Sequence, residues 1–217
     1  MLRECDMDEI SDGKRYQAND MVKLGCNDCM GCHSCCEGME DTIVLDPYDI
    51  YRLTKNLDLD FTVLMQGRIA LHVEEGLILP HMAMSEHTGA CSFLNEEGRC
   101  SIHAHRPGIC RLFPLGRIYE NDGFSYFLQV NECMKENRTK EKIKNWLQTP
   151  RLKDYEAFIL KWHNYAKEMQ TFLANREDAK DWNMLHLQTF YIMPYASEDF
   201  YEEFEVRLAD MRKRMVM

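Results

Sequence analysis

The chain has 217 residues, of which 45% are hydrophobic and 29% are charged, and its formal net charge is -10. This composition is ordinary for a globular protein, and the length suits one fair-sized domain or one domain with a helical extension. No stretch approaches the roughly 20 apolar residues of a membrane helix, and an acidic chain is a poor partner for nucleic acid. We therefore expect a globular protein that binds neither membrane nor nucleic acid.

Residues 1–25 are predicted to form a loosely ordered lead-in with one short helix near Met7 to Ile10. The first ten residues, MLRECDMDEI, carry charges where a secretory signal would need an apolar region. We therefore expect a cytoplasmic protein, whose cysteines stay reduced. Cys5 stands apart from the other cysteines, and we leave it out of the candidate site.

The stretch from Cys26 to Cys36 reads CNDCMGCHSCC and places five cysteines in eleven residues. Gaps of two residues let a turn direct successive sulfurs toward one centre, as in zinc sites and iron–sulfur clusters. The polar residues between the cysteines argue against an apolar core, and the expected reducing compartment argues against disulfides. The pattern therefore favours metal binding, with a thiol redox relay as the alternative.

Short helices, strands and turns are predicted after this loop. Asp46 and Asp60 are typical N-cap residues, and Asn121-Asp-Gly123 is a strong hairpin signal. The predicted elements are a helix from Pro47 to about Lys55, a helix from Phe61 to Gln66, a hairpin of 68–74 and 77–82, a cysteine-bearing turn from Cys91 to Cys100, and a hairpin of 115–120 and 124–130.

From Thr139 onward the chain has no cysteine and no glycine, and apolar residues recur with the helical period. The predicted helices are Leu152 to Leu173, about Glu177 to Tyr191, and Glu198 to about Arg214 with Ser197 as N-cap. We therefore predict an α+β protein. Its expected parts are a lead-in (1–25), a metal-binding domain with short strands and hairpins (26–138), and an all-helical C-terminal region packed on it (139–217).

Nine cysteines remain as candidate metal ligands once Cys5 is set aside: Cys26, Cys29, Cys32, Cys35, Cys36, Cys91, Cys100, Cys110 and Cys133. Nine ligands exceed one tetrahedral site. Neighbouring side chains of an extended backbone point to opposite faces, so Cys35 and Cys36 are poorly placed to bind the same ion. We therefore expect either two centres or one polynuclear centre. One arrangement gives three loop cysteines and a distant sulfur to one centre, and Cys36, Cys91 and Cys100 to another.

Three successive sulfurs from one loop resemble the ligation of cubane iron–sulfur clusters, whereas zinc sites usually combine pairs of ligands from two places. The spacing therefore favours an iron–sulfur cluster over Zn²⁺. Arg106 and Arg111 flank Cys110 and are expected to offset thiolate charge. Three histidines lie close to cysteines and could replace a sulfur, although positions outside the ligand set are favoured for them: His33, His103 and His105.

Four motifs occur together in this chain: Cys29-x2-Cys32-x2-Cys35-Cys36, Val44-Leu45-Asp46 with Asp49-Ile50-Tyr51-Arg52-Leu53, Cys91-x-Phe93-Leu94 with Cys100-Ser101-Ile102, and Arg106-Pro107-x-x-Cys110-Arg111-x-Phe113-Pro114. In this combination residues 26–135 resemble the YkgJ-like cysteine-cluster family, also called CxxCxxCC. That family is described as chelating zinc or iron, was formerly labelled as an iron–sulfur oxidoreductase, and includes the domain of flagellin lysine N-methylases. The resemblance implies seven family cysteines, Cys29, Cys32, Cys35, Cys36, Cys91, Cys100 and Cys110, and Cys26 extends the motif by one step.

The sequence contains no GxGxxG, no GxxxxGK[ST] and no Cys-x3-Cys-x2-Cys triplet of the radical type. S-adenosylmethionine therefore has no motif to bind it, although the resemblance to methylases keeps it as a candidate cofactor. Three functions stay open: a redox or electron-transfer protein with a redox partner, a protein-modifying enzyme such as a lysine N-methylase with a protein substrate, and a zinc-binding structural or interaction module. An open metal site would separate the first two from the third.

Overall fold

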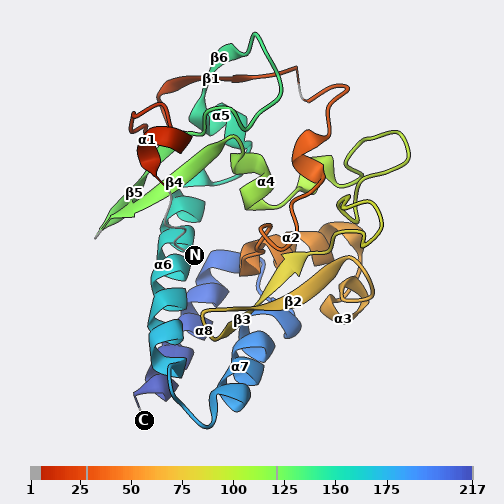
Figure 1. Cartoon of the computed structure of the whole chain (residues 1–217). Helices are drawn as coiled ribbons and strands as arrows, with labels where there is room; N and C mark the ends of the chain where they lie inside the picture. The colour runs from red at the N-terminus through yellow and green to blue at the C-terminus, as the bar shows by residue number, and fades with distance from the viewer. Residues whose placement is uncertain (1–5, 28, 121, 217) are drawn as a thin grey trace. The chain divides into compact units, whose positions relative to one another are not determined.

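The computed structural model describes residues 6–27, 29–120 and 122–216. The chain folds into two compact units, each made of two segments (Figure 1). Unit 1 comprises Met1–Met39 and Met84–Leu152, and unit 2 comprises Glu40–Ala83 and Lys153–Met217. Antiparallel strand pairs and helices together confirm the α+β class. Cys5 and Asn121, which the sequence analysis discussed, lie outside the described residues, and the expected domain boundaries at 25 and 138 stay a prediction.

Unit 1 is built from short elements: α1 (Met7–Ile10), β1 (Met21–Gly25), a 3-10 turn (Ser34–Cys36), a second 3-10 turn (His103–His105), α4 (Gly108–Leu112), β4 (Leu115–Glu120), β5 (Gly123–Leu128), β6 (Thr139–Lys142) and α5 (Ile143–Leu147). The short N-terminal helix is confirmed as predicted. The hairpin of β4 and β5 is also confirmed, with Leu115 opposite Leu128 and Glu120 opposite Gly123.

The pairing of β1 with β6 corrects two predictions. Residues 21–25 form a strand rather than part of a loosely ordered lead-in, and the segment expected to be all helical begins with a strand at Thr139–Lys142. Val22 and Leu24 alternate with exposed residues and are buried, so β1 contributes to the core of unit 1. Its partner, β6, has the sequence TKEK and contains no apolar residue. The backbone hydrogen bonds to β1, rather than burial of side chains, therefore account for this strand.

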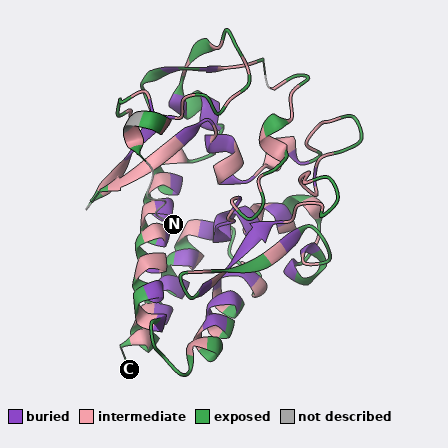
Figure 2. Ribbon diagram, viewed as in Figure 1, coloured by how far each residue is buried: buried purple, intermediate pink, exposed green. Residues whose placement is uncertain are grey.

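The core of unit 1 is formed by three strands and two helices. Figure 2 maps its buried residues. Its members come from β1, α4, β4, β5 and α5: Val22, Leu24, Leu112, Leu115, Tyr126, Leu128, Ile143, Trp146 and Leu147. The cysteine-bearing loops contribute little to burial. No described residue of 26–39 is buried, and 84–106 contain only two buried residues, Phe93 and Ile102.

Unit 2 contains the longer helices: α2 (Pro47–Leu57), α3 (Phe61–Leu64), β2 (Ile69–Glu74), β3 (Leu77–Met82), α6 (Leu152–Leu173, in unit 2 from Lys153), α7 (Ala179–Leu187), a π-helical turn (Gln188–Ile192) and α8 (Phe200–Met215). Asp46 begins α2 with a capping box, in which Asp49 N donates to Asp46 Oδ1 over 2.8 Å and Asp46 N donates to Asp49 Oδ2 over 3.2 Å. The predicted hairpin is confirmed as β2 and β3.

An aromatic core joins the helices of unit 2. Phe158 of α6 contacts Phe204 of α8 edge to face with centroids 4.7 Å apart, and Trp162 contacts Phe190 in the same manner over 5.3 Å. These rings confirm that the apolar stripe of α6 is core. Two boundaries differ from the prediction: the second helix changes to a π-helical turn after Leu187, and Asp199 rather than Ser197 caps α8, because its carboxylate accepts from Tyr201 N.

None of the helices in the described ranges is long and apolar enough to cross a membrane.

Candidate metal centre

The loop after β1, which carries five of the cysteines, folds as a series of tight turns. Asn27, Cys29 and Gly31 adopt left-handed backbone conformations with φ of 55°, 56° and 67°. Backbone hydrogen bonds close three turns: Met30 N to Asn27 O over 3.0 Å, Cys32 N to Cys29 O over 2.9 Å, and Cys36 N to His33 O over 2.7 Å. The gap from Cys29 to Cys32 is thus itself a turn, and the other two turns begin between cysteine positions.

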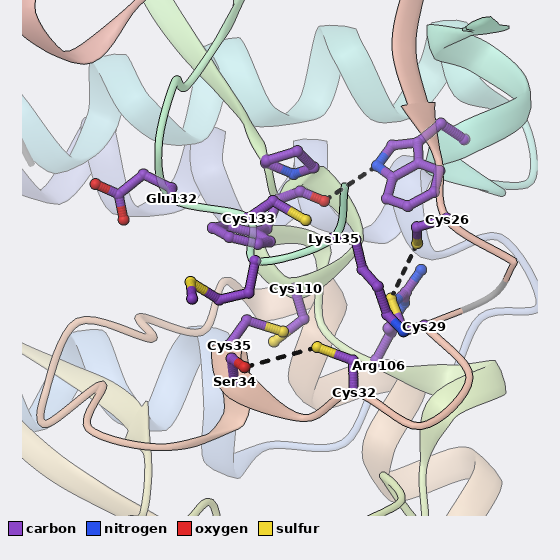
Figure 3. A pocket seen from close by; sticks show the side chains of 14 residues that line it. Cys26, Cys29, Cys32, Ser34, Cys35, Arg106, Cys110, Glu132, Cys133 and Lys135 are labelled. Carbon is purple, nitrogen blue, oxygen red and sulfur yellow. Dashed lines mark hydrogen bonds between the residues drawn. The ribbon is translucent and has the colours of Figure 1, made fainter. Parts of the chain in front are cut away.

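Six cysteines from three parts of unit 1 line one pocket, shown in Figure 3: Cys26, Cys29, Cys32, Cys35, Cys110 and Cys133. The first four come from the loop, Cys110 from α4, and Cys133 from the segment after β5. The pocket has an empty volume of about 450 Å³, part of which is open solvent. The pocket therefore brings the loop together with Cys110 and Cys133, which lie far from it in sequence. Two of the six cysteines, Cys26 and Cys133, are not part of the family motif.

Two pairwise contacts join thiols of this pocket to neighbouring polar atoms. Cys26 Sγ lies 3.4 Å from Cys29 Sγ, and Cys32 Sγ lies 3.6 Å from Ser34 Oγ (Figure 3). No three His, Cys, Asp or Glu side chains in the described ranges are arranged about a single point as ligands of one ion. The sulfurs are thus gathered at one pocket and paired rather than set in a coordination geometry. The chemistry of the donor set, six thiols facing one space, nevertheless fits a thiolate-bound metal.

The other three described cysteines, Cys36, Cys91 and Cys100, do not line the pocket, and we treat them as a second group. Cys91 N donates to Cys36 O over 2.7 Å. The pKa of Cys36 is raised first by the hydrogen bond with the Cys35 thiol, then by burial, and by smaller contributions from the thiols of Cys35, Cys100 and Cys91. The pocket lining includes Cys35 but not Cys36. The expected alternation of Cys35 and Cys36 does not apply, because Ser34–Cys36 form a 3-10 turn rather than extended backbone, and the two thiols hydrogen-bond to each other. The use of Cys36, Cys91 and Cys100 as metal ligands stays a prediction.

A tight turn at Gly98 brings Cys91 and Cys100 together. Gly98 N donates to Asn95 O over 3.0 Å, and Leu94 pairs with Cys100 across the turn. Gly98 has φ of 68°, and a Cβ atom there would lie 2.9 Å from Nδ1 of His33. The positive φ therefore favours glycine here, and a side chain at this position would also require the partly exposed His33 ring to move.

The thiols of the loop differ in how readily they ionise. A hydrogen bond with the Cys36 thiol lowers the pKa of Cys35 to about 6, and Arg106 acts in the same direction. The same hydrogen bond raises the pKa of Cys36 well above its ordinary value, and burial adds to the rise. Burial, followed by the hydrogen bond with Cys26, raises the pKa of Cys29 to about 12. The pair at Cys35 and Cys36 therefore holds one proton between two sulfurs.

Cationic and apolar side chains complete the pocket. Arg106 lines it and donates from a guanidinium nitrogen to Nε2 of His103 over 3.2 Å, and Lys135 Nζ donates to Met30 O over 2.8 Å. Trp146 closes one wall and donates from Nε1 to Phe113 O over 3.1 Å. No sequence motif indicated Lys135 or Trp146, because each reaches the pocket only through the fold of unit 1.

The three histidines near cysteines stay outside the pocket lining as far as the structure describes it: His33, His103 and His105. His103 accepts the hydrogen bond from Arg106, and His33 Nε2 lies 3.6 Å from Glu37 Oε1. Arg111 is buried within α4 and does not line the pocket, whereas Arg106 does. Of the two arginines expected to offset thiolate charge, Arg106 therefore lines the pocket itself.

A sequence profile matches residues 28–145, more than half of the 217-residue chain. It is the profile of the CxxCxxCC family, described as "Putative zinc- or iron-chelating domain". No curated protein and no solved structure matches the chain. The matched range contains eight of the nine candidate cysteines, all except Cys26, and both cysteine groups described above. The chain therefore belongs to the CxxCxxCC family of cysteine-cluster domains.

Proposed function

We propose that the pocket holds an iron–sulfur cluster and that the group of Cys36, Cys91 and Cys100 holds a separate structural metal ion. The observation that carries this proposal is the convergence of six cysteines on one pocket that opens to solvent. Iron–sulfur clusters are held by four cysteine thiolates, and three successive thiols of one loop, as at Cys29, Cys32 and Cys35, resemble their ligation. The cluster supplies one-electron chemistry when it is bound.

The residues around the pocket support a metal centre in distinct ways. Cys26, Cys29, Cys32, Cys35, Cys110 and Cys133 supply the thiolates, and Arg106 and Lys135 offset their negative charge from the rim. Trp146, Phe113 and Pro114 form an apolar wall, which limits access of water on that side. Hydrogen bonds, burial and nearby charge are the means by which a protein sets the reduction potential of such a centre.

The metal content of the protein tests this proposal directly. Protein purified without oxygen is expected to be coloured, to contain iron and acid-labile sulfide, and to carry one additional zinc or iron ion per chain, because the two cysteine groups bind separately. Elemental analysis, sulfide assay and a visible absorption spectrum measure these quantities. A colourless protein with zinc in both cysteine groups and no sulfide contradicts the iron–sulfur proposal and leaves the structural zinc module.

We propose electron transfer with a protein partner as the function of the pocket, because all nine described cysteines are partly exposed and the pocket opens to solvent. The expected result is a reversible one-electron couple in voltammetry of the anaerobic protein. The same preparation should add no methyl groups to flagellin or other lysine-bearing proteins when S-adenosylmethionine is supplied, as mass spectrometry would measure. Methyl addition without a reversible couple would replace electron transfer by lysine N-methylation.

A further inference from the structure

The β2–β3 hairpin of unit 2 and the segment before α2 together bring two histidines and two carboxylates into one cluster, separate from the cysteines: Asp41 from the segment, and His72, Glu74 and His81 from the hairpin. His81 pairs with Ala70 across the hairpin, so His72, two residues further along β2, is its diagonal neighbour on the same face. The two imidazole rings have centroids 4.8 Å apart. The fold therefore brings two imidazoles to one place from two strands.

His81 is fully buried, and one of its ring nitrogens makes no hydrogen bond. Nδ1 contacts the carbonyl oxygen of Asp41, and a carbonyl can only accept, so the proton of the neutral ring resides on Nδ1. Nε2 is therefore a lone-pair donor without a hydrogen-bond partner. Burial lowers the pKa of His81 from its ordinary value, which favours this neutral ring.

The lone pair of His81 faces a carboxylate. His81 Nε2 lies 3.6 Å from Glu74 Oε1, and both atoms are acceptors when the ring is neutral. Beside them, His72 Nδ1 lies 3.8 Å from Asp41 Oδ2. Two acceptors that face each other repel unless a proton or a cation lies between them. The cluster thus combines two carboxylates with the neutral imidazole of His81 and with His72, and none of its four members is a lysine or an arginine, a donor set that suits a divalent cation.

We propose that Asp41, His72, Glu74 and His81 form a further metal site without cysteine ligands, which binds a divalent cation of the zinc type through His81 Nε2 and Glu74 first. Two ligands about 2.1 Å from one zinc ion are 3.6 Å apart when the angle between them is about 120°. A histidine ligand typically donates its other ring N–H to a backbone carbonyl, as His81 does to Asp41. Imidazole and carboxylate together are ligands that zinc accepts.

Completion of this site requires movement of His72. The donors in the described ranges are not yet set about one point, and only pairs of them lie within 4 Å of each other. The side chain of His72 is 43% exposed, so it can turn toward the ion, whereas His81 is fixed by burial. Asn183 and Gln170 hold the hairpin from α7 and α6, since Asn183 Nδ2 donates to Gly76 O and Gln170 Nε2 donates to Glu74 O. The fixed ligands therefore sit on a rigid hairpin.

Equilibrium dialysis of the full-length protein with its cysteine-bound metal already in place tests the proposal. Added Zn²⁺ should bind as one further equivalent per chain, counted by elemental analysis. His72→Ala should weaken this binding at least about 10-fold, because even groups that only orient a ligand change metal affinity about 10- to 100-fold. Glu74→Gln should weaken it as well. His87→Ala is the matched control, since His87 is exposed and lies outside the cluster, and it should bind zinc as the parent protein does.

Added Co²⁺ identifies the ligands spectroscopically. Binding at the hairpin should give weak d–d bands without a thiolate-to-cobalt charge-transfer band, because its ligands are nitrogen and oxygen. His72→Ala is the test variant rather than a change at the buried His81, because the His72 side chain is 43% exposed and its removal leaves the core of unit 2 intact. The proposal is overturned if no further equivalent binds, if His72→Ala binds it unchanged, or if the cobalt spectrum shows thiolate ligation.

Discussion

Replacement of Cys110 by serine is expected to remove iron from the pocket and to leave the metal at Cys36, Cys91 and Cys100 in place. Cys110 lines the pocket from α4, and it is not part of the second cysteine group. A serine hydroxyl does not ionise near neutral pH, so it replaces the thiolate poorly. We expect the affinity of the pocket for its metal to fall by at least about 10- to 100-fold. Iron and sulfide content of the anaerobically purified variant measure the loss.

Cys91→Ser is the reciprocal variant, since Cys91 lies beside Cys36 and outside the pocket lining. It should lose the separate ion and keep the iron of the pocket. Cys5→Ser serves as the control, because Cys5 is expected to take no part in either group. If Cys110→Ser and Cys91→Ser lose the same metal in the same proportion, the nine cysteines hold one polynuclear centre and the division at Cys35 and Cys36 is wrong.

The sequence predicted best what depends on local chemistry. Asp46 and Pro47 specified the start of α2, Glu75-Gly76 specified the turn of the β2–β3 hairpin, and the stripe on α6 specified an apolar core. The expected alternation at Cys35 and Cys36 assumed an extended backbone and was wrong in that premise, because Ser34–Cys36 form a 3-10 turn in which the two thiols hydrogen-bond to each other. The division of the cysteines between two centres therefore stays a prediction.

Features that depend on distant partners could not be predicted in this way. The strand Thr139–Lys142 consists of TKEK and shows no alternation of apolar residues, and it is a strand only because β1 supplies its hydrogen bonds. Trp146 and Lys135 reach the pocket through the packing of unit 1. The histidine cluster was also missed, although the register of the hairpin would have placed His72 diagonal to His81 once both strands were known.

Removal of the metals is expected to unfold the cysteine-bearing loops while the rest of the protein stays folded. The described residues of 26–39 include none that is buried, and 84–106 bury only Phe93 and Ile102. These loops therefore have little apolar contact to hold them once the thiolates lose their ions. Structural zinc supplies about 10–16 kcal/mol of apparent folding free energy in small zinc-finger peptides, so ligation is large enough to order such loops.

Hydrogen exchange with mass spectrometry can follow each segment separately. After chelation under reducing conditions, amides of 26–39 and 84–106 should lose their protection. Amides of β4 and β5 should keep theirs, because Leu115, Tyr126 and Leu128 belong to the core of unit 1, and α6 should keep its protection because its aromatic residues pack within unit 2. Cys32→Ser should reproduce part of the loss without a chelator, since Cys32 lines the pocket.

The pattern of protection then distinguishes two roles of the metal. Loss confined to the two loops means that the ions organise the site on a scaffold that the apolar core already stabilises. Loss that spreads through β1, β6 and α5 means that the core cluster around Val22, Leu24 and Ile143 is too small to persist alone. Full protection of both loops in metal-free protein contradicts the prediction, because their backbone would then be ordered without ligation.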